Sequence, residues 1–402
     1  MKEPTIKKPS WRSFPLGVIL LFLLAHLSHH LVTALPVPLL PFIRDEFALN
    51  YTQASLVTAA FGIVYGASQL PAGWLADRIG PRTLITLMGI IGVAVTGFLV
   101  GLSQTYLMLI ICLMLMGILG GSYHPAATAM ITTLLKPENW GRALGFHMVG
   151  GGLSYFLIPL IAAGLAAVWG WRGAFIALTI PTIAFGVLLH VLLGRQAPIK
   201  KVEPKTAGSA AETPFGKNRF RRLISILIMS AFTQAVALST VSLLPLYLVD
   251  HFSVSREVAA ASISLVYSAG LWAGPVGGYL SDHWSRITMI LIPCLATGPV
   301  IYLLNQAPYG IGIGAVLVFI GTTIYVNTTA AQAYIVDNTP ERTRSTMLGI
   351  YFFGTMEGHG VLTPVIGYLF DRVGFYLSFT IVGAAVLAVS FICTGLFWSS
   401  RD

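Results

Sequence analysis

Charge is what this sequence has least of. Lys, Arg, Asp and Glu together make up 10% of the 402 residues, whereas hydrophobic residues make up 55%. Soluble proteins carry about 25% charged residues. This composition excludes a soluble globular domain and indicates a polytopic membrane protein.

Cysteine is also scarce, because the chain has only Cys112, Cys294 and Cys393, and each lies inside an apolar run. Their spacing predicts neither a disulfide framework nor a metal site. A Walker phosphate-binding pattern is absent as well, so ATP is not expected to drive the protein. The net charge of +9 comes from basic residues between apolar runs, which is typical of membrane topology rather than of nucleic-acid binding.

Apolar runs of about 20 residues or more, separated by polar turns, predict an all-α membrane protein. Twelve transmembrane helices are expected. Their ranges are 15–43, 51–76, 83–103, 106–135, 143–168, 173–193, 222–249, 256–281, 287–304, 310–337, 345–369 and 375–397.

The basic residues predict how these helices are oriented. Of the 24 Lys and Arg residues, 20 lie on the side that holds both termini and 4 on the other side. Because cytoplasmic loops carry the excess of Lys and Arg, we expect a multi-pass protein of the cell inner membrane with both termini cytoplasmic. Two six-helix bundles, 15–194 and 222–397, are expected on either side of a cytoplasmic linker, 195–221, with short cytoplasmic ends at 1–14 and 398–402.

The two halves of the chain repeat a pattern with an offset of 205 residues. The matching pairs are Phe47 and Phe252, Gly73 and Gly278, Asp77 and Asp282, and Pro159 and Pro364. This repeat predicts two six-helix units in parallel orientation, related by an axis along the membrane normal. In secondary transporters of this kind the substrate site lies at the interface between the repeats.

The segment 73–82 is a dense charge cluster between two long apolar runs. Gly80 and Pro81 favour a tight turn, so two membrane helices are expected to meet here almost back to back at a membrane surface. The pattern Gly73-x-x-x-Asp77-Arg78-x-Gly80-x-Arg82, after the second of twelve helices, closely resembles the signature of the major facilitator superfamily. The resemblance implies two bundles around a central cavity that opens alternately to each side, lined mainly by helices one, four, seven and ten.

The same resemblance implies a set of charged residues that closes the cytoplasmic side, which we call the cytoplasmic lock. Its expected members are Gly73, Asp77, Arg78, Gly80, Arg82, Asp282, Arg142 and Arg344. A carboxylate at Asp77 is favoured by the dipole of a neighbouring helix N-terminus. The alternative is that these charges only set the membrane topology.

A second set of segments is similar to the fosmidomycin-resistance branch of that superfamily, which exports an anionic phosphonate drug. These segments are 26–30, 41–49, 123–125 and 146–151. The sequence departs from that branch where His30 and Ala126 replace acids. It also departs from drug/proton antiporters, because Ile158 stands where they carry a glycine before the proline of helix five. These departures weaken export by antiport and leave uptake open.

Ionisable side chains at membrane depth are costly unless they lie in protein or in a wet cavity, so they are candidates for function. His26, His29 and His30 share one face of a helix because their offsets are three and four. Protonated, they can bind an anion or carry a proton, and the alternative is a hydrogen-bonded packing role. His147 is expected near the cytoplasmic end of helix five, at a gate.

Glu357 is the only acid well inside an apolar span, so we expect it to bind the coupling proton, and a structural pair with a histidine is the alternative. His359 lies about 200° away around the same helix. The sequence leaves open which of these two stripes faces the cavity. The expected substrate or proton residues are Glu357, His30, His26, His124, His359, His29, Asn327 and Gln69.

These patterns predict secondary active transport of a small organic solute by alternating access, coupled to protons, and not an enzyme. Efflux of a drug or metabolite is the first expectation. Proton-coupled import of small organic anions is the alternative, and a membrane receptor or lipid scrambler is a remote third. The expected partners are a small-molecule substrate and the lipid bilayer, with no nucleic acid, metal or cofactor beyond the proton, and the protein is expected to act as a monomer.

Overall fold

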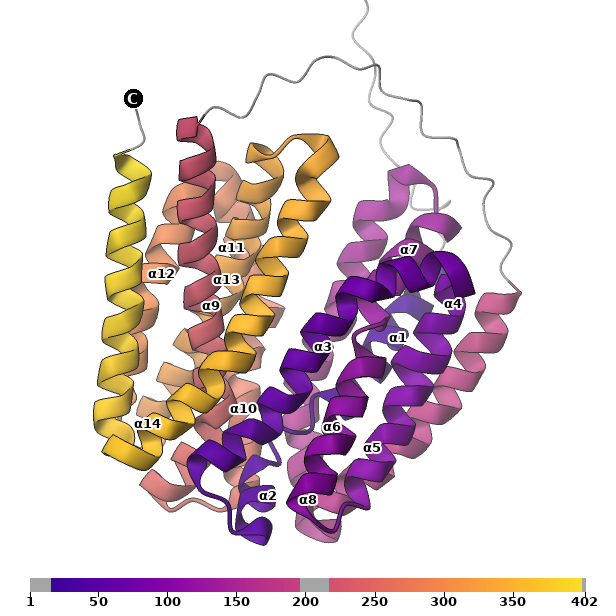
Figure 1. Ribbon diagram of the computed structural model, residues 1–402, viewed down its shortest axis with the longest axis horizontal. Helices are drawn as coiled ribbons and strands as arrows, with labels where there is room; N and C mark the ends of the chain where they lie inside the picture. The colour runs from indigo at the N-terminus through magenta and orange to yellow at the C-terminus, as the bar shows by residue number, and fades with distance from the viewer. Residues whose placement is uncertain (1–15, 196–216, 400–402) are drawn as a thin grey trace, which may run out of the picture.

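The computed structural model describes residues 16–195 and 217–399, and within these ranges the chain is helical without any β-strand. Figure 1 shows the helices running roughly along one direction. Their bounds are α1 (Leu16–Thr33), α2 (Leu40–Phe47), α3 (Tyr51–Ile79), α4 (Pro81–Thr83), the π-helix η2 (Leu84–Gly92), α5 (Val93–Gly101), α6 (Tyr106–Gly120), α7 (Tyr123–Leu134), α8 (Pro137–Gly194), α9 (Lys217–Phe252), α10 (Arg256–Ser268), the 3-10 helix η3 (Ala269–Leu271), α11 (Ala273–His283), α12 (Arg286–Leu303), α13 (Ile311–Asn338) and α14 (Glu341–Trp398).

Nine helical segments of the described chain are long and apolar enough to cross a membrane. Two of them, α8 and α14, have twice the usual length, and each contains one glycine with a positive φ, at Gly170 (68°) and Gly374 (72°). Two helices meet end to end at each of these glycines. Glycine suits these joints because residues with an L side chain rarely adopt a positive φ. When α8 and α14 are counted as two spans each and α3, which has 29 residues, is added, the described chain supplies the twelve spans that the sequence predicts.

Several predicted bounds need correction. The first span, 15–43, is broken after Thr33, because Pro36 and Pro38 lack the backbone N–H that a helix interior requires. Helix α9 begins at Lys217, five residues before the predicted start. The third span begins with the π-helical segment η2, which the apolar pattern does not distinguish from an α-helix.

The internal repeat is visible in the backbone. Ala48 and Ser253, which lie 205 residues apart, are the two described non-glycine residues with positive φ (49° and 54°). Helix N-caps recur with the same offset at Asn50 and Ser255, at Gly80 and Ser285, and at Thr105 and Gly310. The same local structures therefore start and end the corresponding helices of both halves.

The N-terminal half (16–195) and the C-terminal half (217–399) lie side by side and approach each other most closely near α2 (Figure 1). We call this the α2 end and the opposite end, which holds α4, the α4 end. The largest cluster of buried apolar residues draws on both halves, including Val32, Leu109, Phe175, Val236, Tyr247 and Val386. Two smaller clusters each draw on a single half. The halves thus share one core toward the α2 end and have separate cores toward the α4 end.

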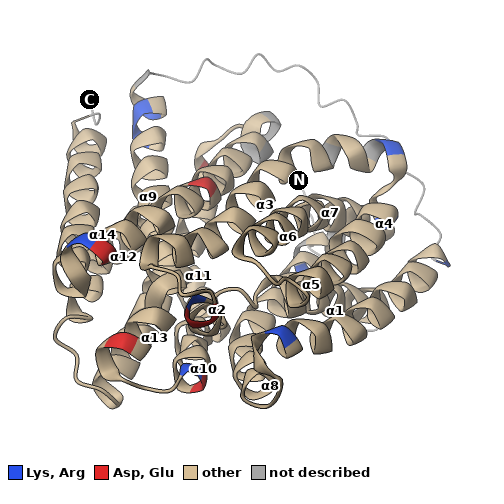
Figure 2. Cartoon of the chain, turned by 60° about the horizontal axis from the view of Figure 1, so that its bottom comes forward, with Lys and Arg blue, Asp and Glu red and all other residues tan. Residues whose placement is uncertain are grey.

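Glycines allow α3 and α14 to cross closely between the halves. A Cβ atom at Gly367 would lie 2.6 Å from Ser55 Oγ and 2.7 Å from the carbonyl oxygen of Tyr51. A Cβ at Gly360 would overlap Ile63. Charged residues lie mainly near the helix ends (Figure 2), as a membrane-spanning fold requires.

Candidate functional site

Five histidines of the N-terminal half form one group, which we call the histidine cluster. Helix α1 supplies His26, His29 and His30, α7 supplies His124, and α8 supplies His147. All are buried except His124, which is half-buried. The three histidines on one face of α1 thus meet His124 and His147 from two other helices, and the gate role of His147 stays a prediction.

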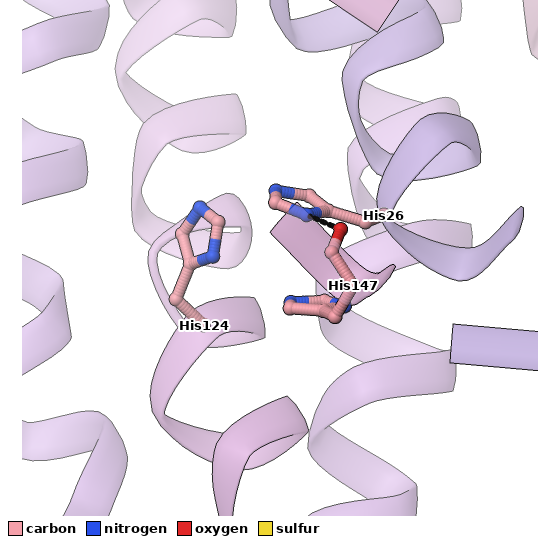
Figure 3. Close-up of side chains that lie close together, drawn as sticks. All are labelled: His26, His124 and His147. Carbon is pink, nitrogen blue, oxygen red and sulfur yellow. Dashed lines mark hydrogen bonds between the residues drawn. The ribbon is translucent and has the colours of Figure 1, made fainter. Parts of the chain in front are cut away.

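The centre of the cluster is drawn in Figure 3. The rings of His26 and His147 stack with their centroids 4.2 Å apart, and His124 meets His26 edge-on at 4.9 Å. His26 Nδ1 donates to the carbonyl oxygen of His147 at 2.7 Å, and His147 Nδ1 donates to that of Phe22 at 3.1 Å. These bonds hold both rings and leave their Nε2 atoms facing the interior of the cluster.

The local sequence makes room for these rings. A Cβ atom at Gly151 of α8 would lie between 2.5 and 3.0 Å from three atoms of the His26 ring, so only glycine permits this approach. Pro125 is the third residue of α7, where the backbone N–H has no partner within the helix. The break between α6, which ends at Gly120, and α7, which begins at Tyr123, lies just before this His-Pro pair.

His29 differs from its neighbours because both of its ring nitrogens have ordinary partners. Nδ1 donates to the carbonyl oxygen of Gly89 at 2.7 Å, and Nε2 accepts from the hydroxyl of Tyr65 at 3.0 Å. Its ring also stacks on Tyr123 at 4.4 Å. These contacts support the packing alternative for His29.

Tyrosines connect the histidine cluster to the other half. The ring of Tyr155 in α8 lies 4.6 Å from that of His30 and 5.0 Å from that of Tyr267 in α10. Beside them, Ser264 Oγ donates to the carbonyl oxygen of Phe156 across the halves at 2.7 Å. Sequence reasoning missed Tyr155, although it follows His147 by eight residues and so lies toward the same side of the helix.

The structure resolves the two stripes of α14. Glu357 points at α3, where a Cβ atom added to Gly66 would overlap its Oε1. That oxygen is buried and has no hydrogen-bond partner among the described residues. His359 bonds to α9, where Ser242 Oγ lies 2.9 Å from its Nε2, and its ring also lies beside Gly62 of α3. Glu357 therefore faces the opposite half of the protein, and the two residues do not pair.

The two remaining polar candidates lie elsewhere. Asn327 of α13 accepts from Ser230 Oγ at 2.8 Å and donates to the carbonyl oxygen of Ser230 at 3.2 Å, which ties α13 to α9. These bonds support an interhelical role for Asn327. Gln69 is half-buried on α3, one turn from Tyr65 and Gly66.

At the α4 end, the expected turn between two membrane helices is present. Gly80 has a φ of 87° between α3 and α4. The guanidinium of Arg78 lies over the ring of Trp74, 3.9 Å from its centroid. Arg82 lies against Gly194 at the C-terminal end of α8, where a helix dipole favours a cation. In this conformation both arginines therefore contact their own half.

The other expected members of the cytoplasmic lock give a similar picture. Asp282 pairs with Arg286 at 2.5 Å, and Arg286 also bonds Asp337 of α13 at 2.8 Å, all within the C-terminal half. Arg142 is half-buried near the start of α8. The side chains of Asp77 and Arg344, and Gly73 likewise, lie outside the described residues. The lock thus stays a prediction.

Sequence reasoning missed a polar network between the halves at the α2 end, which we call the α2-end network. Arg44 makes a two-pronged ion pair with Asp250, with Nη2 and Oδ1 3.0 Å apart, and Tyr51 donates its hydroxyl to Asp250 at 2.7 Å. Asp371 accepts from the backbone N–H groups of Tyr51 and Thr52 at 2.9 and 2.8 Å.

The 205-residue repeat could have indicated this network from the sequence. Asp45, which pairs with Arg44 at 2.8 Å and with Arg256 at 3.4 Å, lies 205 residues before Asp250. Equivalent positions of the two repeats thus both carry an acid where the halves meet.

The comparisons with known proteins agree with this architecture. A probable sulfoacetate transporter of Cupriavidus necator is 27% identical over 396 residues, covering 88% of this chain and 87% of that protein. The fosmidomycin resistance protein of Escherichia coli is 23% identical over 375 residues, covering 91% and 89%. The fold matches the crystal structure of a bacterial homologue of the human lysosomal transporter Spinster, in an inward-facing and occupied conformation, with a TM-score of 0.80, 17% identity and coverage of 98% and 97%.

The family model for the Major Facilitator Superfamily matches residues 22–361, which is most of the chain. It thereby includes the histidine cluster, the turn at Gly80 and Glu357. The relative from Cupriavidus necator is a probable transporter of a small solute, and the family match agrees with it, so the general prediction of membrane transport is confirmed. The chain belongs to the Major Facilitator Superfamily.

Proposed function

We propose that this protein transports small organic anions together with protons and that the histidine cluster is its anion site. The observation that carries the proposal is the composition of the cluster. It holds five imidazoles, and no carboxylate of the described residues pairs with any of them. A proton bound there creates a positive charge in a site of low polarity, which an incoming anion balances.

The same logic favours symport over antiport. A proton and an anion that attract each other bind with positive coupling, so each raises the affinity of the site for the other. Antiport requires the opposite, because one ligand must displace the other. With an inward proton gradient, this coupling drives uptake. Sulfoacetate, after which the relative from Cupriavidus necator is named, is a small organic anion of the appropriate class.

Glu357 supplies the link to the conformational change. Its carboxyl group lies between α14 and α3, at the contact that brings the halves together toward the α2 end. An ionised carboxylate without a partner is unfavourable in such a place. We propose that closure of the α2 end requires Glu357 to be protonated and that release of this proton accompanies reopening.

We propose that the α4 end faces the cytoplasm. The segments joined to that end carry 20 of the 24 Lys and Arg residues, and such an excess marks cytoplasmic loops. The shared core and the α2-end network then close the outer side of the protein. The conformation would therefore be inward-facing, like that of the Spinster homologue to which the fold is similar.

The test is transport into proteoliposomes with radiolabelled sulfoacetate as the first probe. We expect an acidic exterior to drive accumulation inside and a protonophore to abolish it. Exchange of labelled for unlabelled anion should proceed without a gradient. Accumulation driven by an acidic interior would instead establish antiport, and transport of neutral or cationic solutes in preference to anions would refute the proposed substrate class.

Glu357→Gln tests the coupling role. This variant should lose gradient-driven accumulation at least tenfold and keep exchange, because a permanently neutral side chain permits closure but carries no proton. The matched control is Glu46→Gln, the same substitution in α2, where the carboxylate pairs with Arg172 within one half. Unchanged driven accumulation by Glu357→Gln would exclude Glu357 as the coupling site.

A further inference from the structure

Three rings of the histidine cluster, from three different helices, bring nitrogen atoms into one small space. His26 of α1, His124 of α7 and His147 of α8 each offer one nitrogen, and these three atoms all lie within 4.8 Å of one another. Figure 3 shows His124 on one side and the stacked rings of His26 and His147 on the other, with nitrogens turned toward the space between them. Convergent imidazole nitrogens are ligands that transition metals prefer.

Backbone carbonyls fix the tautomers of two of these rings. His26 Nδ1 lies 2.7 Å from the carbonyl oxygen of His147, and His147 Nδ1 lies 3.1 Å from that of Phe22. A carbonyl oxygen only accepts, so each Nδ1 carries the hydrogen of the neutral ring and each Nε2 carries a lone pair. Histidines that bind metals almost always donate their other ring N–H to such an acceptor. His26 and His147 therefore already have the tautomer and the outer partner of metal ligands.

His124 completes the group. The described residues form no hydrogen bond with its ring, so either of its nitrogens can supply a lone pair. It is also half-buried, whereas His26 and His147 are buried. The side of the group at His124 therefore offers a way in for an ion.

His30 does not obstruct this space. Its Nε2 lies 3.2 Å from His26 Nε2, and its Nδ1 lies 2.9 Å from Thr33 Oγ1. The Thr33 hydroxyl can donate to His30 Nδ1 or accept from it, so neutral His30 can carry its hydrogen on either nitrogen. With the hydrogen on Nε2, His30 donates to His26 when no ion is bound. With the hydrogen on Nδ1, it leaves the lone pair of His26 free for an ion.

We propose that His26, His124 and His147 form a binding site for a divalent transition-metal ion of the zinc, copper or nickel class. Imidazole nitrogens suit these ions, whereas magnesium and calcium prefer oxygen ligands. Around a tetrahedral ion with metal–nitrogen bonds of about 2.05 Å, ligand nitrogens lie about 3.3 Å apart. Rotation of the three rings toward one another closes this difference in spacing. The inference concerns the metal alone and does not rest on the proposed function.

This site differs from the expectation of no metal that the sequence supports. Its ligands come from three helices, and their positions along the chain follow no metal-binding spacing. Only the packing of α1, α7 and α8 brings the three rings together.

A second group, His29, His30 and His124, meets the same distance limit but not the same chemistry. His29 Nδ1 donates to the carbonyl oxygen of Gly89 at 2.7 Å, and His29 Nε2 accepts from the hydroxyl of Tyr65 at 3.0 Å. An ion on His29 Nε2 would leave that buried hydroxyl without its acceptor, which is unfavourable. The first group is therefore the metal site, and His29 serves as its control.

The test is metal binding by the full-length protein, purified in detergent without a polyhistidine tag. Co²⁺ is the probe, because its visible absorption reports tetrahedral coordination. We expect the folded protein to bind Co²⁺ with this absorption, Zn²⁺ to displace it, and an excess of Mg²⁺ to leave it unchanged. Absence of tetrahedral Co²⁺ absorption, or displacement of Co²⁺ by Mg²⁺, would overturn the proposal.

Substitution of single ligands identifies the residues that hold the ion. Loss of an outer-shell partner costs about 10- to 100-fold in metal affinity, so loss of a ligand in His124→Gln or His147→Gln should weaken Co²⁺ binding at least about 100-fold. His29→Gln, the matched control, should bind Co²⁺ as the native protein does. Unchanged binding by His147→Gln, or loss of binding in His29→Gln, would refute the assignment.

A second pair of variants leaves every histidine in place and covers the case in which the glutamine variants do not fold. A Cβ atom at Gly151 would lie between 2.5 and 3.0 Å from three atoms of the His26 ring, whereas a Cβ atom at Gly152 has no neighbour within 4 Å. Gly151→Ala should therefore displace the ring and weaken Co²⁺ binding, and Gly152→Ala should not. Equal affinities of these two variants for Co²⁺ would exclude His26 as a ligand and contradict the proposal.

Discussion

The α2-end network should decide how strongly the protein favours the conformation described above, and Asp250→Asn is the perturbation that tests it. Asp250 receives two hydrogen bonds from the Arg44 guanidinium and one from the Tyr51 hydroxyl. The amide of asparagine keeps the shape and removes the charge. Because Arg44 and Asp250 lie on different halves, the loss weakens only the state in which the α2 end is closed.

The magnitude follows from the exposure of the pair. The side chains of Arg44 and Asp250 are 14% and 25% exposed. Fully exposed ion pairs contribute about 0.2–1 kcal/mol, and breaking a buried pair that is held by hydrogen bonds costs about 2–5 kcal/mol. A two-pronged pair of intermediate exposure should therefore contribute about 2 kcal/mol. This free energy corresponds to a shift of about 30-fold in the ratio of closed to open α2 end.

The assay is a distance measurement between spin labels at Gln104 and Gln306, exposed residues of the two halves near the α2 end. The native cysteines are buried, so introduced cysteines can be labelled selectively. Asp250→Asn should increase the population with the longer distance. Arg44→Gln should do the same, and the double variant should add little, because both changes break one interaction. A population ratio that changes less than threefold, or fully additive effects, would refute this reasoning.

Two further predictions concern stability and packing. Burial opposes ionisation of Glu46, but hydrogen bonds from Arg172 and Trp171 hold its pKa below the usual 4.5. Glu46→Gln should therefore lower the thermal midpoint of unfolding at neutral pH, and the difference from the native protein should vanish as pH falls below about 4.5. A difference that stays constant with pH would argue against the ion pair. Gly367→Ala should open the α2 end by forcing Ser55 away, and the same spin labels would report the longer distance. Gly164→Ala should leave the distance unchanged, because a Cβ atom at Gly164 has no neighbour within 4 Å.

The sequence was sufficient for the architecture. Apolar length, turn residues and the offset of 205 residues predict twelve helices in two repeats, and the segment 73–82 indicates the superfamily. These features are local or periodic along the chain, so they survive without knowledge of how helices pack. The sequence did not predict the break after Thr33 as a helix end or the π-helix η2, because apolar composition alone does not report backbone hydrogen bonding.

The site depended on tertiary structure. The sequence placed His26, His29 and His30 on one face, but only the crossing of α1, α7 and α8 brings His124 and His147 to them. The rotation of α14 decides that Glu357 points at Gly66 of α3 without a hydrogen-bond partner among the described residues and that His359 reaches Ser242 of α9. Hydrogen bonds to the carbonyl oxygen of Gly89 and from the hydroxyl of Tyr65 then satisfy both ring nitrogens of His29. Such contacts depend on how each helix is rotated about its axis and how far it is shifted along it, and the periodicity of the sequence does not determine either. They separate the residues proposed to act from those that only pack.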